Sequence, residues 1–277
     1  EISSVAECMG GVEPAFTFVK KCLENGKSVS TSNKELVAAK GDVLLKIAAE
    51  NKCNFFFEAS VGGAIPIIRP LHRCLAANDI NRVSGILNGT TNFILTKMYN
   101  DNIPFDDALN LAQELGYAEK DPTADIEGHD ACRKICIISS LVFGKHVYPK
   151  SVYTKGISQI ELCDIDASDV LGYSMKLVAT VTKTKNDKIL PAVMPMLVPL
   201  DNIMSGVNDV FNAAVIEGDG VDKIMLYGRG AGKLPTASAI LGDVIEAVKH
   251  KVTVFSQRWD SADDDSFVDN INNFNAR

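Results

Sequence analysis

The chain has 277 residues, of which 46% are hydrophobic and 23% charged, as in an ordinary globular protein. Its formal net charge of -7 and the lack of any run of Lys or Arg argue against a nucleic-acid partner. No window approaches the ~18 uninterrupted apolar residues that a membrane span requires, which argues against a membrane partner.

The first sixty residues alternate between short apolar runs and helical patterns. Three strands and two helices are expected, the strands at 4–9, 28–31 and 54–60 and the helices at 14–25 and 35–50. This alternation predicts a parallel α/β layer. The layer lacks the Gly-x-Gly-x-x-Gly turn that follows the first strand of a dinucleotide-binding domain. We therefore expect a partial, Rossmann-like nucleotide-binding domain over residues 1–58.

A second domain of the α+β class is expected over residues 59–230. A helix is predicted from Pro66, and further helices follow a strand at 83–87. Residues 175–228 are rich in strand-forming residues, and their Asn-Asp and Gly-Asp-Gly turns predict hairpins. The result is an antiparallel or mixed sheet covered by helices. A last helix over 231–250 then returns to the first domain, and the polar tail over 251–277 is interpreted as a linker.

The distribution of the cysteines indicates the cellular compartment. All seven are scattered along the chain, and none forms a C-x-x-C pair. An odd number of scattered cysteines does not indicate a disulfide framework, so this distribution favours a reducing, cytoplasmic location.

The segment from residue 116 to 134 is the most informative part of the chain. It contains five carboxylates within twelve residues and ends in Arg133-Lys134, directly before an apolar run. Asp130 and Lys134 are four residues apart, so on a helix they lie on one face. A carboxylate and an amine in this position can bind a small zwitterion and transfer a proton. Capping of a helix N-terminus and an ordinary ion pair explain the same residues when they are taken alone.

Three other segments carry candidate sites. The turn from Asn88 to Thr91 precedes a helix, so its N–H groups suit a carboxylate or a phosphate, although simple capping explains it too. Lys34 follows a strand at its carboxyl end, where α/β sheets bind ligands, but a lysine at a helix start is common. The turn from Glu58 to Pro66 would expose carbonyl oxygens to sodium, or it is merely a close-packed glycine turn.

Together these segments resemble the homoserine dehydrogenase family. The resemblance extends over nearly the whole chain and is most specific between Leu115 and Lys134. It implies an enzyme that interconverts L-homoserine and L-aspartate 4-semialdehyde with NADP or NAD, on the branch toward threonine and methionine. The motifs that carry it are Asn88-Gly89-Thr90, Gly116-Tyr117-Ala118-Glu119, Asp121-Pro122, Asp125, Gly128, Asp130, Arg133-Lys134 and Gly228 to Gly232.

The resemblance also implies a role for individual residues. Lys134 is similar to the family's proton donor to the substrate oxygen, and the catalytic group would comprise Lys134, Lys34 and Asp130. Substrate contacts would come from Glu119, Asp125, Asp130, Thr90 and Gly89. Cofactor contacts would come from Cys8, Met9, Gly10, Ser32, Lys34, Gly116, Gly230 and Gly232. A structural sodium ion would be held by Glu58 with the carbonyls of Val61, Gly63 and Ile65.

The sequence departs from the family at both ends. Members carry a Gly-rich phosphate-binding segment in front, and many carry an ACT-type regulatory domain behind. This sequence shows neither, so we expect a fragment that keeps the substrate pocket and forms a homodimer through its sheet, but holds the cofactor weakly. One alternative is an inactive oligomeric remnant. Another is a metal-dependent lyase or hydrolase that binds a divalent ion through Asp121, Asp125 and Asp130.

Overall fold

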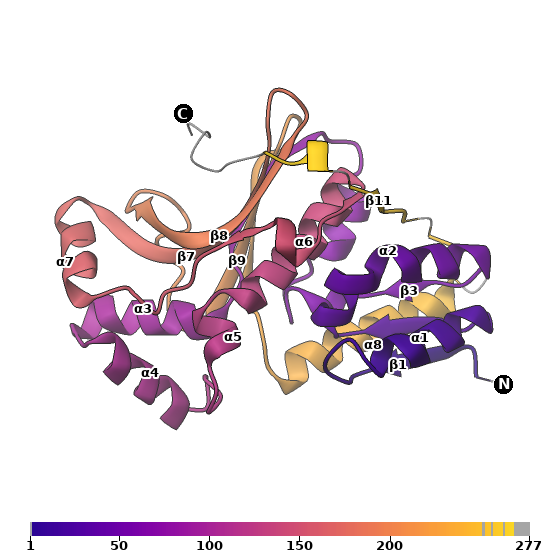
Figure 1. The fold of residues 1–277 in the computed structure, drawn as a ribbon, viewed down its shortest axis with the longest axis horizontal. Coiled ribbons are helices and arrows are strands. Elements are labelled where there is room, and N and C mark those ends of the chain that lie inside the picture. Colours follow the sequence, from indigo (N-terminus) through magenta and orange to yellow (C-terminus); the bar gives the residue numbers. More distant parts are fainter. Residues whose placement is uncertain (1, 251–252, 256, 263, 269–277) are drawn as a thin grey trace.

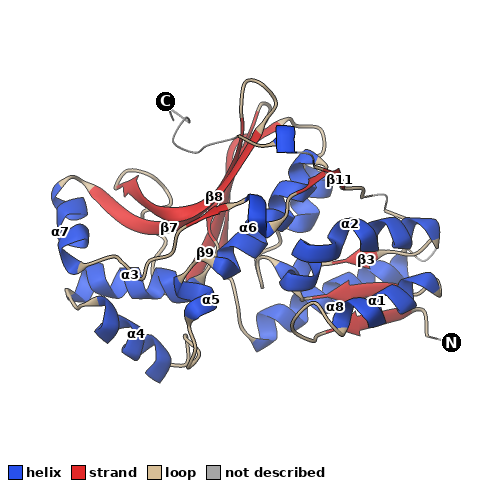
Figure 2. Ribbon diagram, in the orientation of Figure 1, coloured by secondary structure: helices blue, strands red, loops and turns tan. Residues whose placement is uncertain are grey.

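A three-stranded parallel sheet between helices forms the first unit of the computed structural model, which describes residues 2–250, 253–255, 257–262 and 264–268 (Figures 1 and 2). Both strand pairs are parallel, so each connection crosses over in the same sense. The helices α1 and α2 therefore cover one face, and α8 packs on the other. The elements are β1 (Ser4–Glu7), α1 (Ala15–Glu24), β2 (Ser28–Thr31), α2 (Lys34–Glu50), β3 (Phe55–Phe56) and α8 (Lys233–Lys249).

A six-stranded mixed sheet forms the second unit, in the order β10-β9-β4-β7-β8-β6. Every neighbouring pair is antiparallel except β6 with β8. The helices α3 and α6 pack on this sheet, α4 packs on α3, and α2 of the first unit packs on α6. The strands are β4 (Ile80–Ile86), β6 (Tyr153–Thr154), β7 (Tyr173–Lys183), β8 (Ile189–Pro199), β9 (Phe211–Gly218) and β10 (Asp222–Arg229). The helices are α3 (Gly89–Asp101), α4 (Phe105–Glu114), α5 (Thr123–Ile126), α6 (His129–Phe143) and α7 (Leu162–Val170).

The predicted fold class is confirmed, but two predicted elements are corrected and one helix was missed. The third strand ends at Phe56, because Glu58–Ser60 turns into a 3₁₀ helix. No long α-helix follows Pro66; the regular structure there is a π-helical turn over Pro70–Cys74, which begins at a second proline. The helix α7 was not predicted, because only Ile165 and Ser168 of its residues are buried and no apolar stripe marks it. A capping box of Glu161 and Asp164 stabilises it instead.

The tail that was interpreted as a linker packs on both units in its described residues. Trp259 is only 6% exposed and lies edge-on to Phe57. The short strand β11 (Asp260–Ser261) pairs with β5 (Lys145–His146), which follows α6. Farther on, Phe267 bridges to Ile189 at the start of β8. The tail therefore crosses from the first unit to the second, while residues 251–252, 256, 263 and 269–277 lie outside the described part.

Helix length and polarity bear on the membrane question. Among the described residues, every helix is too short or too polar to cross a bilayer.

Candidate active site

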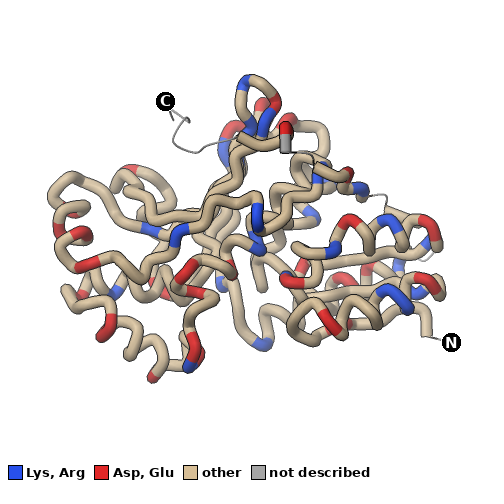
Figure 3. The backbone as a smooth tube through the Cα atoms, in the orientation of Figure 1, with Lys and Arg blue, Asp and Glu red and all other residues tan. Residues whose placement is uncertain are grey.

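A cavity of about 400 Å³ lies where the two units meet. The N-termini of three helices converge on it, with Lys34 at the start of α2, Thr90 at the start of α3 and Asp130 at the start of α6. The segment that joins α4 to α6 closes one side and is rich in acidic positions, drawn in red in Figure 3. Helix N-termini carry partial positive charge, so this convergence suits anionic groups.

Asp130 holds two lysines at the centre of this cavity. Its Oδ1 lies 2.9 Å from the Lys34 Nζ, and its Oδ2 lies 2.7 Å from the Lys134 Nζ. The Asp130 and Lys134 side chains are 7% and 9% exposed, whereas that of Lys34 is 38% exposed. The structure thus brings together the three residues that the sequence predicts as catalytic. Lys34 comes from the first unit and the other two come from the second.

The local backbone explains how Asp130 and Lys134 reach the cavity. Gly128 precedes α6 with φ +80°, a left-handed conformation that favours glycine. Lys134 also donates to the backbone oxygen of Leu87, at 2.7 Å, which fixes its ammonium at the end of β4. Asn88 donates to Asp125 Oδ1 at 2.7 Å and to Asp130 Oδ2 at 2.9 Å. These hydrogen bonds therefore connect the end of β4 to the first turns of α6.

Electrostatics fix the charge states in the site. Burial alone would raise the pKa of Asp130, but the ammonium groups of Lys134 and Lys34 outweigh it and hold that pKa well below its usual range. Burial would likewise lower the pKa of Lys34, and the Asp130 carboxylate reverses this and raises it. For Asp125, burial and the neighbouring Asp130 charge both raise the pKa. Asp130 and Lys34 are thus charged at neutral pH, and Asp125 takes up a proton more readily than an ordinary aspartate.

The predicted substrate-binding residues line the same cavity. Thr90 donates through its hydroxyl to Tyr117 O at 2.7 Å, which joins the start of α3 to the acidic segment. Glu119 is exposed on the rim, and its backbone oxygen accepts from the Gln113 side chain at 3.0 Å. Gly89 and Asp125 complete the predicted set. The structure therefore gathers all of these residues around the pair of lysines.

The predicted cofactor-binding residues fall into two groups. Four lie at the carboxyl ends of β1 and β2, beyond the cavity lining, namely Cys8, Met9, Gly10 and Ser32. Three line the cavity from its other side, namely Gly116, Gly230 and Gly232, and Lys34 stands between the two groups. A Cβ added at Gly10 or at Gly116 would meet no atom within 4 Å. The carboxyl edge of the parallel sheet thus has open space beside it, at the edge where α/β sheets bind nucleotides.

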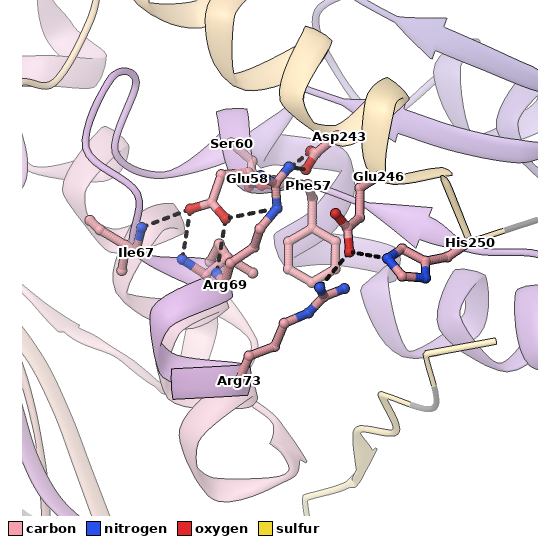
Figure 4. A network of polar contacts seen from close by, with 10 residues as sticks. Phe57, Glu58, Ser60, Ile67, Arg69, Arg73, Asp243, Glu246 and His250 are labelled. Atoms are coloured by element: carbon pink, nitrogen blue, oxygen red, sulfur yellow. Dashed lines mark hydrogen bonds and ion pairs between the residues drawn. The ribbon is translucent and has the colours of Figure 1, made fainter. Parts of the chain in front are cut away.

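The carboxylate of Glu58 belongs to a network that joins α8 to the turn after β3 (Figure 4). Its Oε1 accepts from the backbone N–H groups of Ile67 and Ile68, at 2.7 and 2.8 Å. Its Oε2 accepts from the Arg69 N–H at 2.9 Å. Asp243 of α8 accepts from the Glu58 N–H at 3.0 Å and from the Arg69 guanidinium. Protein donors therefore occupy this carboxylate, which leaves it poorly suited to hold a sodium ion.

The carbonyl groups predicted to hold sodium fit better than the Glu58 carboxylate. Within the described part of the chain, the oxygens of Val61, Gly63 and Ile65 accept no backbone hydrogen bond. A Cβ at Gly62 would lie 2.4 Å from Ile65 O, so this glycine lets the turn close tightly. Hard cations take such oxygen ligands.

The alternative metal site on the acidic segment is not assembled. Asp121 accepts from the Thr123 hydroxyl at 2.6 Å and caps α5 instead of lining the cavity. Asp130 is already paired with both lysines. Among the described residues, no group of three His, Cys, Asp or Glu side chains has the arrangement of a metal site. The lyase or hydrolase alternative therefore has no support in the described part of the chain.

Several cavity residues were missed from the sequence. Asn88 was predicted in a turn that binds an anion or caps a helix, and its bridge between two carboxylates was not foreseen. Asn212 of β9 lines the cavity, and so does the end of β10 at Arg229, whose guanidinium lies over the Phe211 ring. Their positions follow from the approach of the sheet to α3, which no local pattern signals. Arg133, in contrast, was part of the basic pair and proves structural, since it pairs with Glu35 of α2 at 3.1 Å.

Sequence relatives identify the family to which the chain is similar. The family model described as homoserine dehydrogenase matches residues 66–245. The homoserine dehydrogenase of Bacillus subtilis (strain 168) is 44% identical over 250 residues, which cover 90% of this chain and 58% of that protein. The homoserine dehydrogenase of Corynebacterium glutamicum is 44% identical over 256 residues, with 91% and 58% covered. The chain thus spans less than two thirds of these relatives.

Solved structures give the same picture. The homoserine dehydrogenase of Thiobacillus denitrificans superposes with a TM-score of 0.90 at 40% identity, covering 97% of this chain and 63% of that one. A hyperthermophilic archaeal homoserine dehydrogenase in complex with NADPH gives a TM-score of 0.78 at 34% identity, with 89% and 72% covered. The likeness therefore extends over both units and over the cavity between them.

Proposed function

The chain belongs to the homoserine dehydrogenase family, and from this we propose that the protein is an NAD- or NADP-dependent oxidoreductase acting on L-homoserine and L-aspartate 4-semialdehyde. The observation that carries the proposal is the group of Lys34, Asp130 and Lys134 in one cavity. Two ammonium groups and a shared carboxylate suit a reaction in which an oxygen gains and loses a proton.

Lys134 is the proton donor in this proposal. When the aldehyde is reduced, its oxygen becomes an alkoxide that needs a proton, and a bound nicotinamide would supply the hydride to the carbon. An ammonium has three N–H donors. Within the described residues, two of those on Lys134 point to Asp130 Oδ2 and Leu87 O, each at 2.7 Å, which leaves the third for the substrate oxygen. Asp130 fixes the position of this ammonium.

The acidic wall of the cavity would bind the substrate ammonium. Glu119 lies on the rim and Asp125 lies deeper, beside Asn88. Carboxylates pair strongly with an ammonium when the site excludes water. Thr90 and Gly89, at the start of α3, would contact the substrate through their backbone.

The nicotinamide cofactor would lie along the carboxyl edge of β1 and β2. Cys8, Met9, Gly10 and Ser32 are at this edge, and Lys34 would face both cofactor and substrate. Gly116, Gly230 and Gly232 would contact the nicotinamide end from across the cavity.

Three further features are part of the proposal. A sodium ion would be held mainly by the carbonyls of Val61, Gly63 and Ile65, for the reasons given above. Two copies would form a homodimer through the six-stranded sheet. The free thiols, such as exposed Cys8 and buried Cys53, are consistent with a cytoplasmic location.

The direct test is an assay of the purified protein with its natural flanking sequence. We expect L-homoserine to drive reduction of NAD or NADP, followed by the absorbance of the reduced nicotinamide, and L-serine to give little reaction. The product should be L-aspartate 4-semialdehyde. An absence of homoserine-dependent reduction with either nucleotide would refute the proposed activity and would favour an inactive oligomeric protein.

A further inference from the structure

Glu7, the last residue of β1, has a buried carboxylate that the proposed reaction has not yet used. The residue is 5% exposed. Its Oε1 accepts from the Met9 backbone N–H at 2.6 Å, and its Oε2 accepts from the Thr31 hydroxyl. Thr31 is the last residue of β2, so this carboxylate joins the carboxyl ends of the two parallel strands. Hydrogen bonds to a charged acceptor are stronger than those between neutral groups.

Asn33 extends this network to the start of α2. Its backbone N–H donates to the Thr31 hydroxyl oxygen at 2.9 Å. The two ends of its side-chain amide have different partners. The Oδ1 accepts from the Leu36 N–H at 3.0 Å and so caps α2, whereas the Nδ2 donates to Gly11 O at 2.7 Å. Asn33 therefore connects the first turn of α2 to the turn that follows β1.

The turn from Cys8 to Gly11 is held at both ends by these two side chains. Within the described part of the chain, its last three residues form no hydrogen bond to another backbone group. Its first three residues are exposed, although the side chains that hold the turn are buried. Without these hydrogen bonds the turn would have more conformations, and a ligand that binds it would have to order it at a cost in entropy.

We propose that Glu7 and Asn33 are positioning residues for the nicotinamide nucleotide, because they fix the turn from Cys8 to Gly11 before the nucleotide binds. The inference rests on the proposed function, since it takes the ligand beside this turn to be that nucleotide. Both residues act through the turn and need no contact with the nucleotide. Asn33 also directly precedes Lys34. The same side chain therefore fixes the turn and the start of the helix that carries the active-site lysine.

The main test is Asn33→Ser in the protein with its natural flanking sequence. Serine keeps an oxygen that can cap α2, but it is too short to reach Gly11 O. NADPH and NADH are titrated into the protein, and binding is followed by the fluorescence of the nucleotide. The dissociation constant of the nucleotide that wild-type protein binds should rise roughly three- to tenfold. The KM for L-homoserine should change little, because the pair of Lys34 and Asp130 is untouched.

A second pair of variants tests Glu7. Glu7→Ala removes the acceptor of the Met9 N–H and should weaken nucleotide binding at least roughly tenfold. Glu7→Gln keeps an acceptor of the same length and should restore most of the affinity. Asn25→Ser is the matched control for Asn33→Ser. It removes a similar hydrogen bond, from the Asn25 Nδ2 to Lys21 O at 2.7 Å, but at the far end of α1, and should leave nucleotide binding unchanged.

Two outcomes would overturn the inference. If Asn33→Ser and Glu7→Ala bind the nucleotide like the wild type, the turn does not depend on these side chains. If nucleotide and L-homoserine are weakened equally, the two residues only stabilise the first unit. Urea unfolding of each variant establishes that it is folded under the conditions of the titration. A wild type that binds neither nucleotide would instead refute the proposed function, and the inference with it.

Discussion

The carboxylate of Asp130 forms ion pairs with two ammonium groups, and the resulting charge imbalance determines which charge the site stabilises on a ligand. Lys34 and Lys134 lie 2.9 and 2.7 Å from its two oxygens, so the group carries one excess positive charge. In a site that is largely closed to water, such a charge stabilises negative charge that develops on a substrate oxygen. An alkoxide formed within reach of Lys134 would gain from this charge before the proton is transferred.

The central residues could be predicted because local rules place them. The spacing of Asp130 and Lys134 puts them on one helix face, and Lys34 follows a strand of a parallel layer. Asn212 could not be predicted, since its place in the cavity depends on two glycines far away in sequence. The donors to the Glu58 carboxylate could not be predicted for a similar reason, because they belong to a turn whose geometry no local pattern signals.

Asp243 gives a prediction about pH and stability. Burial is the main cause that raises its pKa from 3.8 to about 6, against the pull of Arg69 (Figure 4). The folded state thus holds this proton more tightly than the unfolded chain. The resulting stabilisation is fully present below the unfolded pKa and is lost as the pH rises through about 6. Its size is roughly 3 kcal/mol, since each pKa unit is worth about 1.4 kcal/mol.

The matched variant is Asp243→Asn, which cannot titrate. Urea unfolding at several pH values between 4 and 7 should show that wild-type stability falls relative to this variant across the window. The difference between the two proteins removes the contributions of other carboxylates, such as Asp125. If the free energy of unfolding changes with pH in parallel for the two proteins, Asp243 titrates near its ordinary pKa.

Among the elements, the tail departs most from what its sequence pattern indicates. Its polar composition predicts a free linker, but one Trp and one Phe supply anchors. The Asn54 side chain donates to Thr253 O at 2.9 Å, and Trp259 packs against Phe57 and His146. The helix α7 was missed for the same reason, since few of its residues are buried. Elements held by a few long-range contacts leave no periodic pattern in the sequence.

Docking of the tail can be followed through Trp259, the single tryptophan of the chain. A Cβ on Gly41 would lie 2.3 Å from its Cζ3, so Gly41→Ala should displace the indole. We expect red-shifted fluorescence, stronger quenching by acrylamide, and a loss of stability on the order of 3 kcal/mol or less, the scale of a lost buried aromatic contact. Gly206→Ala is the control, because its Cβ would meet nothing within 4 Å. Identical spectra for the two variants would contradict the packing of Trp259.

At the scale of the whole molecule, the face of the six-stranded sheet that is turned away from the helices is the surface proposed to form the homodimer. Strand alternation turns Val193 and Leu226 toward the helices, so their neighbours Met194 and Tyr227 face the other way. Tyr227 is 53% exposed there, and Met194 is partly exposed. An exposed apolar sheet face is typical of a protein–protein interface, and this supports the proposed homodimer.

Light scattering after size exclusion tests the homodimer. Wild-type protein should have twice the mass of one chain, and Tyr227→Glu should shift it toward the monomer by placing a charge in the interface. Phe18→Glu serves as the control, since Phe18 is similarly exposed at 51% but lies on α1 of the first unit. A monomeric wild type, or a dimer that Tyr227→Glu leaves intact, would rule out this interface.

The cavity between the two units is the central claim, and Lys134 tests it most directly. The measurement is the kcat and KM of Lys134→Ala for L-homoserine, beside Lys120→Ala as an exposed lysine of the same acidic segment. Asp130 keeps Lys34 as its partner, so the site should stay folded and the KM should change little. The kcat should fall roughly 10²–10⁴-fold, the usual contribution of a positioned acid, while Lys120→Ala behaves as the wild type. A kcat near the wild-type value in Lys134→Ala would contradict the account.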